Sequence, residues 1–398
     1  MTRLKKFVSA LHLWMGLSSG AIVFLLGLTG CILAFAVEIK SVIHPHNQQT
    51  DVLGGHPLPF SQLIHTAQKY WGAEKPVSTL ELYNDPSKTW HFRAFKENAK
   101  TGFWYWEEKE YYESVFIDPY TGKIIRHENS EFEFFRIILY LHWSLLLDTA
   151  IGQPIVGIAT LIYVLLLITG LYLWWPKSKQ ARRKRFWFRW KSNTGAKRKN
   201  YELHSILGFY MLSIGLVIAF TGILWAFPWL AGQVEELLNR EQPQSSMETK
   251  SITFPYKTTL QAPYDAILSD LKNRYPSALG YLFYFPKDAN APRISTMVRF
   301  EKAYETIVRT YNLQTGTVME THRFQEQPTG TKLRAMYYDL HVGSILGLPS
   351  KILAFSASLI SASLPLTGFF IWYNRKKRNI IKPEKTFIKY EWQNKKGA

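Results

Sequence analysis

Residues 7–37 read FVSALHLWMGLSSGAIVFLLGLTGCILAFAV and contain no Asp, Glu, Lys or Arg. A helix rises about 1.5 Å per residue, so this stretch is long enough to cross about 30 Å of hydrocarbon. It is also longer than the apolar core of a signal peptide, about 7–15 residues, and we expect a retained anchor. Three further stretches, 155–175, 203–230 and 352–373, are equally free of charge. The sequence therefore predicts four transmembrane helices and excludes an ordinary soluble fold.

Basic residues flank these stretches and predict their orientation. The chain carries 48 Lys and Arg against 30 Asp and Glu, a formal net charge of +18. Lys and Arg gather before the first stretch, in the linker 177–200 with eleven, and in the tail after Tyr373 with nine. Such residues remain on the cytoplasmic side. We therefore expect both termini inside and segments 38–150 and 228–340 outside, and we interpret the basic runs as topology signals rather than a nucleic-acid surface.

The chain is an internal duplication. Paired marks recur 192 to 199 residues apart. They are Leu11-His12 with Leu203-His204, Thr29-Gly30 with Thr221-Gly222, Leu141-His142 with Leu340-His341, and Thr169-Gly170 with Thr367-Gly368. So small a drift indicates a true repeat, with each half made of a span, an outside domain and a second span.

The predicted fold is a membrane α-helical bundle of four transmembrane helices with two α+β extracytoplasmic domains. The outside segments show helical spacing at 60–71 and 264–275, strand-like alternation at 78–83, 90–95 and 307–311, and an Asp-Pro-x-Thr-Gly turn at 118–122. The predicted spans lie in segments 7–37, 131–176, 201–230 and 331–374. The predicted outside domains are 38–130 and 231–330, and the predicted basic cytoplasmic pieces are 177–200 and 375–398.

Four histidines carry the chemical argument: His12, His142, His204 and His341. A single histidine at a helix end is more often bonded to a carbonyl. Four that the repeat places symmetrically, two at each membrane face, point to function, because titratable groups at membrane depth are costly. Neutral imidazole is a good ligand for haem iron, and helical bundles hold such ligands on facing helices.

Geometry selects the pairs of ligands. Two imidazoles on one iron need metal–nitrogen bonds of about 2 Å, and His12 and His142 lie at opposite faces of the layer. His12 with His204, and His142 with His341, are therefore the predicted axial pairs of two haems. Glycines near them either let a flat macrocycle approach the backbone or serve helix packing. They are Gly16, Gly208, Gly343 and Gly347.

Other metal and redox centres are poorly supported. Cys31 is the only cysteine, and the chain has no H-E-x-x-H, phosphate-binding or dinucleotide-binding motif. A loop site of His44, His46 and His56 is a minor zinc alternative. His127 and His322, related by the repeat, are either structural or contacts to a substrate near the outer haem. The cytoplasmic pieces are too short for a flavin domain, so we expect a separate donor, a reduced flavin or a reductase.

The sequence resembles the PepSY-associated transmembrane family. The resemblance rests on Leu11-His12-x-Trp14-x-Gly16 with Leu28-Thr29-Gly30, on Leu141-His142-x-Ser144, on 167–176, and on Leu340-His341-x-Gly343 with Gly347-Leu348-Pro349. It covers about residues 3–378, and the outside segments look like PepSY units. Similar proteins are inner-membrane ferric-siderophore reductases with two haems b. The resemblance implies haem ligation by the family histidines, a bacterial inner-membrane location with periplasmic domains, and a ferric siderophore or other ferric chelate as substrate.

Two other functions stay open at this point. The outside domains of a non-redox protein could bind or regulate a secreted protease or sense a ligand, with the histidines only structural. An oxidoreductase of the same build could instead reduce a quinone, a periplasmic redox protein, or a copper or haem complex. Haem content separates the first alternative from the redox reading.

Overall fold

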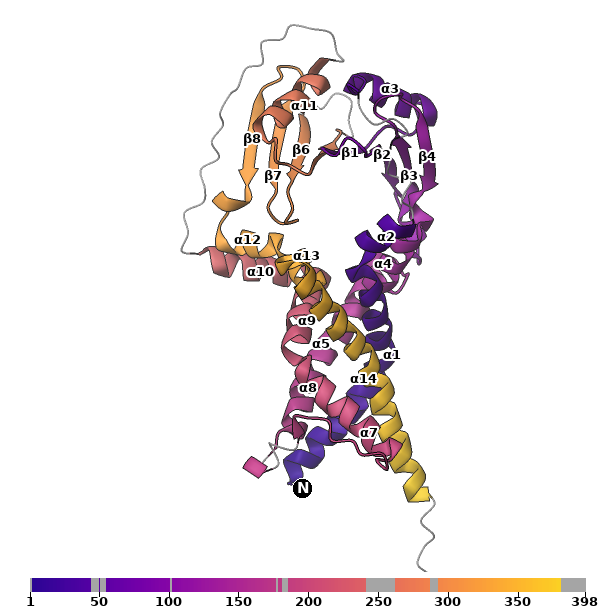
Figure 1. Cartoon of the computed structure of the whole chain (residues 1–398), viewed down its shortest axis with the longest axis vertical. Coiled ribbons are helices and arrows are strands. Elements are labelled where there is room, and N and C mark those ends of the chain that lie inside the picture. The colour runs from indigo at the N-terminus through magenta and orange to yellow at the C-terminus, as the bar shows by residue number, and fades with distance from the viewer. Residues whose placement is uncertain are drawn as a thin grey trace, which may run out of the picture.

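The computed structural model describes residues 2–43, 50, 55–100, 102–176, 178–180, 185–240, 262–286 and 293–380. Long helices form an elongated stem, and a β-sheet with two helices forms a head at one end (Figure 1). The start of α1 and the end of α14 both lie at the end of the stem opposite the head (Figure 1). His44 and His46 lie outside the described residues.

Three helices of the stem are long and apolar enough to cross a membrane: α1 (Arg3–Ala34), α5 (Thr149–Trp174) and α14 (Leu348–Ile380). A fourth candidate is broken. Ala196–Tyr210 and Leu212–Ala226 pass the same test together, but they meet at an angle of 65°. The sequence predicts a continuous span over 203–230, and the structure replaces it with this bent pair. Its pieces are α7 (Ala196–Glu202), the π-helical turn η4 (Leu203–Leu207), α8 (Gly208–Tyr210) and α9 (Leu212–Ala226).

The head contains one antiparallel sheet of eight strands in the order β4-β3-β2-β1-β5-β6-β7-β8. The first half supplies β1 (Thr79–Tyr83), β2 (Trp90–Glu97), β3 (Lys109–Ile117) and β4 (Ile124–Asn129). The second half supplies β5 (Gly280–Tyr284), β6 (Arg293–Arg299), β7 (Ile307–Asn312) and β8 (Val318–Arg323). The two outside segments therefore do not form separate units as the sequence suggests. They join through β1 and β5, which pair from Thr79 with Tyr284 to Tyr83 with Gly280.

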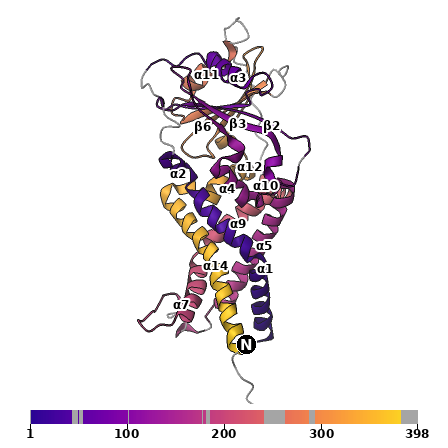
Figure 2. The same cartoon turned by 90° about the vertical axis from the view of Figure 1, so that its right-hand side faces the viewer.

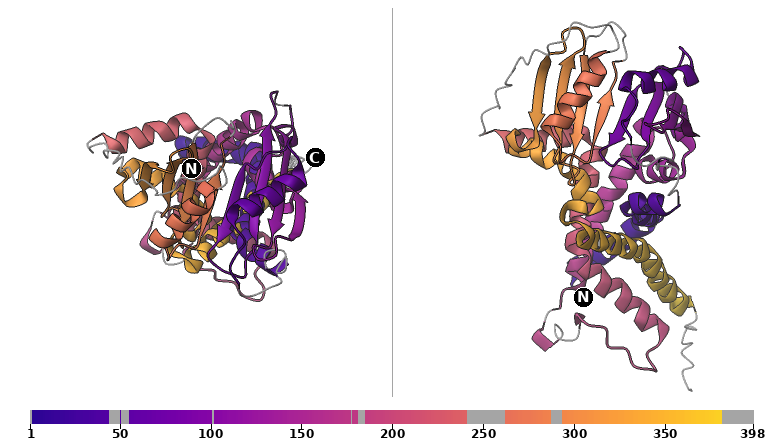
Figure 3. Two further views of the ribbon diagram at one scale, coloured as in Figure 1. Left: turned by 90° about the horizontal axis from the view of Figure 1, so that it is seen from above. Right: turned by 45° about the horizontal axis from the view of Figure 1, so that its top comes forward.

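Two helices cover the face of the sheet that points away from the stem (Figure 2). These are α3 (Phe60–Trp71) and α11 (Ala262–Arg274), which lie near each other above the sheet (Figure 3). Asp265 of α11 accepts the backbone N–H of Phe60 at 2.6 Å, so one half caps the helix of the other. Phe60 and Leu271 belong to a single buried apolar core that also includes Phe92 and Phe283. The shared core and the shared sheet therefore join the two halves into one head.

Shorter helices join the head to the stem. They are α2 (Ala36–Ile43), α4 (Phe134–Ser144), α10 (Pro228–Asn239), α12 (Thr329–Ala335) and α13 (Tyr337–Val342). The predicted turn after β3 is confirmed, since Gly122 has φ +70°, and its repeat equivalent Gly316 has the same value. Side chains in this conformation are strained, so glycine fits both turns.

Candidate functional site

The four histidines form two pairs at opposite ends of the stem. The ring centres of His12, on α1, and His204, in η4, lie 6.4 Å apart. The ring centres of His142, on α4, and His341, on α13, lie 6.0 Å apart. The structure thus brings together the pairs that the sequence predicts. One member of each pair comes from each half of the duplication.

A threonine from a neighbouring helix holds each imidazole through Nδ1. The distance from Nδ1 to the threonine Oγ1 is 2.9 Å in all four cases. The contacts join His12 to Thr169, His142 to Thr29, His204 to Thr367, and His341 to Thr221. These threonines are the Thr-Gly marks of the repeat. Within each half, the threonine of the first span contacts the histidine that precedes the second span, and the threonine of the second span contacts the histidine of the first.

The hydrogen bonds define the imidazole tautomer. Each threonine hydroxyl lies close to a carbonyl of its own helix, as Thr29 Oγ1 does to Leu25 O at 2.7 Å. Thr169 bonds Leu165 O at 2.7 Å in the same way. A hydroxyl has one proton to donate, so its oxygen accepts from the imidazole Nδ1–H. The lone pair of each ring then lies on Nε2, the atom that binds a metal, and the threonine acts as an outer-shell support of the kind that orients metal-bound histidines.

A glycine lies beneath each ring, directly after the threonine. A Cβ added at Gly170 would lie 3.3 Å from Cε1 of His12, and one at Gly30 would lie 3.4 Å from Cε1 of His142. Gly368 and Gly222 stand in the same relation to His204 and His341, at 3.2 and 3.4 Å. Any larger residue would press on the imidazole. The Thr-Gly dipeptide therefore forms a seat for one histidine ring, and the fold contains it four times.

The spacing of the pairs fits an iron porphyrin. Two imidazoles that share one iron, with iron–nitrogen bonds of about 2 Å, place their ring centres about 6 Å apart. The observed separations are 6.4 and 6.0 Å. Each pair also opens into a cavity, of about 460 Å³ at His12 and His204 and about 1000 Å³ at His142 and His341. Ligand sites of proteins are typically about 300–1,000 Å³ and mostly apolar. The donor set, its tautomer and the space agree with a haem in each site.

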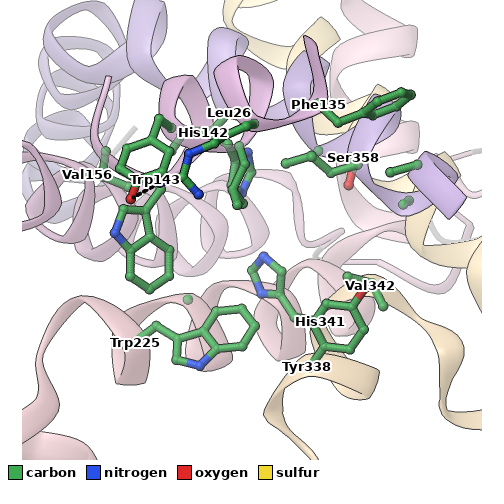
Figure 4. Close-up of a pocket in the computed structure, with 18 of the residues that line it drawn as sticks. Leu26, Phe135, His142, Trp143, Val156, Trp225, Tyr338, His341, Val342 and Ser358 are labelled. Carbon is green, nitrogen blue, oxygen red and sulfur yellow. Dashed lines mark hydrogen bonds between the residues drawn. The ribbon is translucent and has the colours of Figure 1, made fainter. Parts of the chain in front are cut away.

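The cavity at His142 and His341 is the outer cavity, because it extends from the stem to the sheet. Figure 4 shows the two imidazoles entering it from different helices, with Trp225 beside His341. The ring centres of Trp225 and His341 are 5.0 Å apart. Lys40, His91 and Arg93 line the same cavity at the head. The outer cavity therefore connects a candidate cofactor site with a polar region beneath the sheet.

The cavity at His12 and His204 is the inner cavity, at the end of the stem away from the head. Gly16 and Gly208 line it one helical turn after their histidines, as the repeat predicts. Tyr163 and Val23 line both cavities, so they lie between them. The hydroxyl of Tyr163 is 2.7 Å from Ser361 Oγ. A tyrosine from one half is thus fixed by a serine from the other, between the two histidine pairs.

A charged cluster lies on the sheet. Glu81 accepts hydrogen bonds from Arg93, at 2.6 Å, and from Arg299. Burial alone would raise the pKa of Glu81, but the two guanidinium groups outweigh it and lower this pKa to about 2. Burial lowers the pKa of His91 to about 3, and Arg93 adds to the effect. Arg93 donates to Nδ1 of His91 at 3.1 Å, which agrees with a neutral ring.

The structure does not bring His127 and His322 together. They lie on β4 and β8, at opposite edges of the sheet, and neither lines one of the two cavities. His127 contacts Glu113 at 3.3 Å, and His322 contacts Glu320 at 3.5 Å. The geometry favours the structural interpretation for both.

Two glycines of the sequence prediction also have another role. Gly343 has φ +79°, and a Cβ there would lie 2.5 Å from Ser350 O. Gly347 has φ +72°. Both serve the turn between α13 and α14 rather than the approach of a flat macrocycle. Within the described residues, no group of three His, Cys, Asp or Glu side chains could hold a metal ion; the loop site of His44, His46 and His56 falls partly outside these residues and stays a prediction.

The supporting threonines were not predicted from the sequence. Their signal was present as four Thr-Gly dipeptides, at Thr29, Thr169, Thr221 and Thr367, each near the end of a span. The sequence reading used them only as marks of the repeat. Pairing each mark with the histidine in the partner span of the same half would have identified the seat.

Comparison with known proteins gives one family. The model of the family described as the PepSY-associated TM region matches residues 9–375, nearly the whole chain. A comparison with proteins of curated function finds no match.

Proposed function

The chain belongs to the family of the PepSY-associated TM region, and from this we propose that it is a di-haem electron-transfer protein of a bacterial inner membrane. In this proposal it reduces the iron of a ferric siderophore or other ferric chelate outside the membrane. Electrons come from a cytoplasmic donor, a reduced flavin or a reductase.

The observation that carries the proposal is the repeated histidine seat. Two imidazole pairs with ring centres 6.4 and 6.0 Å apart lie at opposite ends of one helical stem. Each ring is held at Nδ1, which leaves Nε2 for a metal. Structural histidines need neither a shared tautomer nor a facing partner. Four identical seats therefore favour a pair of bound cofactors.

The topology follows from the arrangement of the stem. If the bent pair α7–α9 counts as one span, the stem has four spans. The start of α1 and the end of α14 then share one side of the membrane with the described linker residues 185–195. Lys and Arg favour the cytoplasm, so the head with its two PepSY-like halves is periplasmic in this proposal.

Each group of residues has a distinct role in the mechanism. Two haems, when bound, would supply one-electron chemistry at the two ends of the stem. The four histidines would hold the iron, the four threonines orient the imidazoles, and the glycines leave room for the rings. Tyr163 lines both cavities and so lies between the two sites. The outer cavity admits the ferric substrate beneath the sheet, where gaining one electron turns Fe(III) into Fe(II) and weakens its hold on oxygen ligands.

The proposal is tested in proteoliposomes that contain the full-length protein and trap reduced flavin mononucleotide. Ferric citrate outside should be reduced to Fe(II), which an impermeant Fe(II) chelator records. Protein with His142→Ala should insert normally but reduce little, because it lacks an outer ligand. Haem-free protein with no reduction would contradict the proposal and favour a non-redox protein that binds a secreted protease or a ligand.

A further inference from the structure

The inner cavity has an electropositive mouth. Lys5, Arg185 and Arg375 line it, and the described residues that line it include no Asp or Glu. The outer cavity differs, because Glu128 and Glu133 accompany its cations. A cavity with three cations and no acid is suited to an anion.

Helical geometry places these cations at one level. Lys5 precedes His12 by seven residues on α1, and Arg375 follows Gly368 by seven residues on α14. Seven residues are two turns, so each cation lies on the same helix face as its partner and about 10 Å further from the head. Arg185 is held at the same end by a 2.5 Å bond to the carbonyl of Trp174, the last residue of α5. The cations thus come from three different segments and surround one opening.

We infer that Lys5, Arg185 and Arg375 bind the two carboxylates of the porphyrin that His12 and His204 hold. This inference rests on the proposed function. An iron porphyrin of the b type is apolar except for two carboxylates on one edge. Carboxylates inside hydrocarbon are costly, whereas at this mouth they meet cations. The carboxylate edge then points away from the head, and the apolar edge points toward Tyr163.

A phosphate has the same chemistry, so a reduced flavin nucleotide could use the same cations. Volume favours the porphyrin. The inner cavity has a volume of about 460 Å³, against about 1000 Å³ for the outer cavity, and His12 and His204 line it. One bound macrocycle leaves little room for a second ligand, and the experiment separates the two sources.

The test compares two ligands on full-length protein produced without haem. His142→Ala and His341→Ala remove the outer pair, so that only the inner site remains. This protein is titrated with haem and with haem dimethyl ester, which has the same macrocycle without its charges. We expect haem to bind at least tenfold tighter than the ester, because charge-assisted hydrogen bonds are the stronger kind. Lys5→Gln and Arg375→Gln should each reduce this preference, whereas Lys6→Gln, an exposed neighbour, should not.

A second measurement keeps all four histidines. Removing a cation near the iron favours the ferric form, so Arg375→Gln should lower the equilibrium constant for reduction of the inner haem about tenfold, or about 59 mV. Equal affinity for haem and its ester in the parent protein, or equal weakening of both in the variants, would overturn the inference. So would an unchanged preference together with a raised KM for reduced flavin mononucleotide. Failure of the unsubstituted protein to bind any haem would instead reject the proposed function.

Discussion

Thr29→Val should weaken haem binding at the outer site while the fold stays intact. Valine has the shape of threonine but no hydroxyl, so the substitution removes the 2.9 Å bond from Nδ1 of His142. Thr29 is 2 % exposed, and the Nδ1–H would be left in a dry environment. A buried donor without a partner costs about 1–3 kcal/mol. Loss of an outer-shell partner typically lowers metal affinity about 10–100-fold, and each tenfold loss is about 1.4 kcal/mol.

The assay is a haem titration of full-length protein produced without haem, followed by its absorbance. The expected result is one site of normal affinity and one weakened about 10–100-fold. Thr29→Ser keeps the hydroxyl and should bind nearly normally. Ser356→Ala is the control, because Ser356 Oγ makes the same kind of bond to Ile352 O, at 2.8 Å, and Ser356 lines neither cavity. Normal outer-site affinity in Thr29→Val, or equal losses in the Ser and Val variants, would refute the reasoning.

Three further predictions concern other parts of the molecule. Gly170→Val should displace the ring of His12, because a Cβ at position 170 would lie only 3.3 Å from that ring. A pyridine haemochrome assay should then find one haem per chain in place of two, and two haems would contradict the prediction. Tyr163→Leu should slow the reduction of external ferricyanide by a reductant trapped in proteoliposomes. Tyr163→Phe, which keeps the aromatic ring, should slow this reduction less. Equal reduction rates in the two variants would reject a role for the ring. The head should lose stability as pH falls from about 6.5 toward 3, by at most about 1.4 kcal/mol per pH unit, because unfolding lets His91 take up a proton. Protonation of Glu81 lowers the free energy of unfolding as well, but only below about pH 4.5. Between pH 6.5 and 4.5, His91→Phe should therefore reduce the slope of the free energy of unfolding against pH, as measured with urea. An unchanged slope would count against a buried neutral His91.

The membrane elements were predictable because apolar length is a strong signal. The stretch 7–37 lies in α1 except for its last three residues, and 155–175 lies in α5 except for its last residue, although α5 begins earlier, at Thr149. The break at Met211 was not predictable, since 203–230 is mostly apolar and contains no Asp, Glu, Lys or Arg. A π-helical turn at His204 precedes the break, and such turns are rare enough that apolar length alone does not predict them.

The head shows where a repeat misleads. Duplication predicts two similar units, and each half does supply one helix and four strands. An unpaired strand edge tends to find a partner, and β1 and β5 satisfy each other's backbone groups across the repeat. Sequence spacing contains no information on this pairing between halves. Helix 60–71, in contrast, was predicted at its observed bounds because its apolar residues follow one face.

The histidine pairs followed from symmetry and from the thickness of a membrane, but the seats did not. The positions of Thr221 and Thr367 could be read, whereas their contacts with His341 and His204 depend on how neighbouring helices pack. The cations at the inner mouth had a topological explanation in the sequence. Only the fold shows that Lys5 and Arg375 line the same cavity.

The most direct test of the account counts haem per chain in full-length protein and in the four single variants His12→Ala, His142→Ala, His204→Ala and His341→Ala. We expect two b-type haems in the parent protein and loss of one in each variant. We also expect His12→Ala and His204→Ala to lose the same spectral component, and His142→Ala and His341→Ala to lose the other. A parent protein without haem, or a loss pattern that joins His12 with His142, would contradict it.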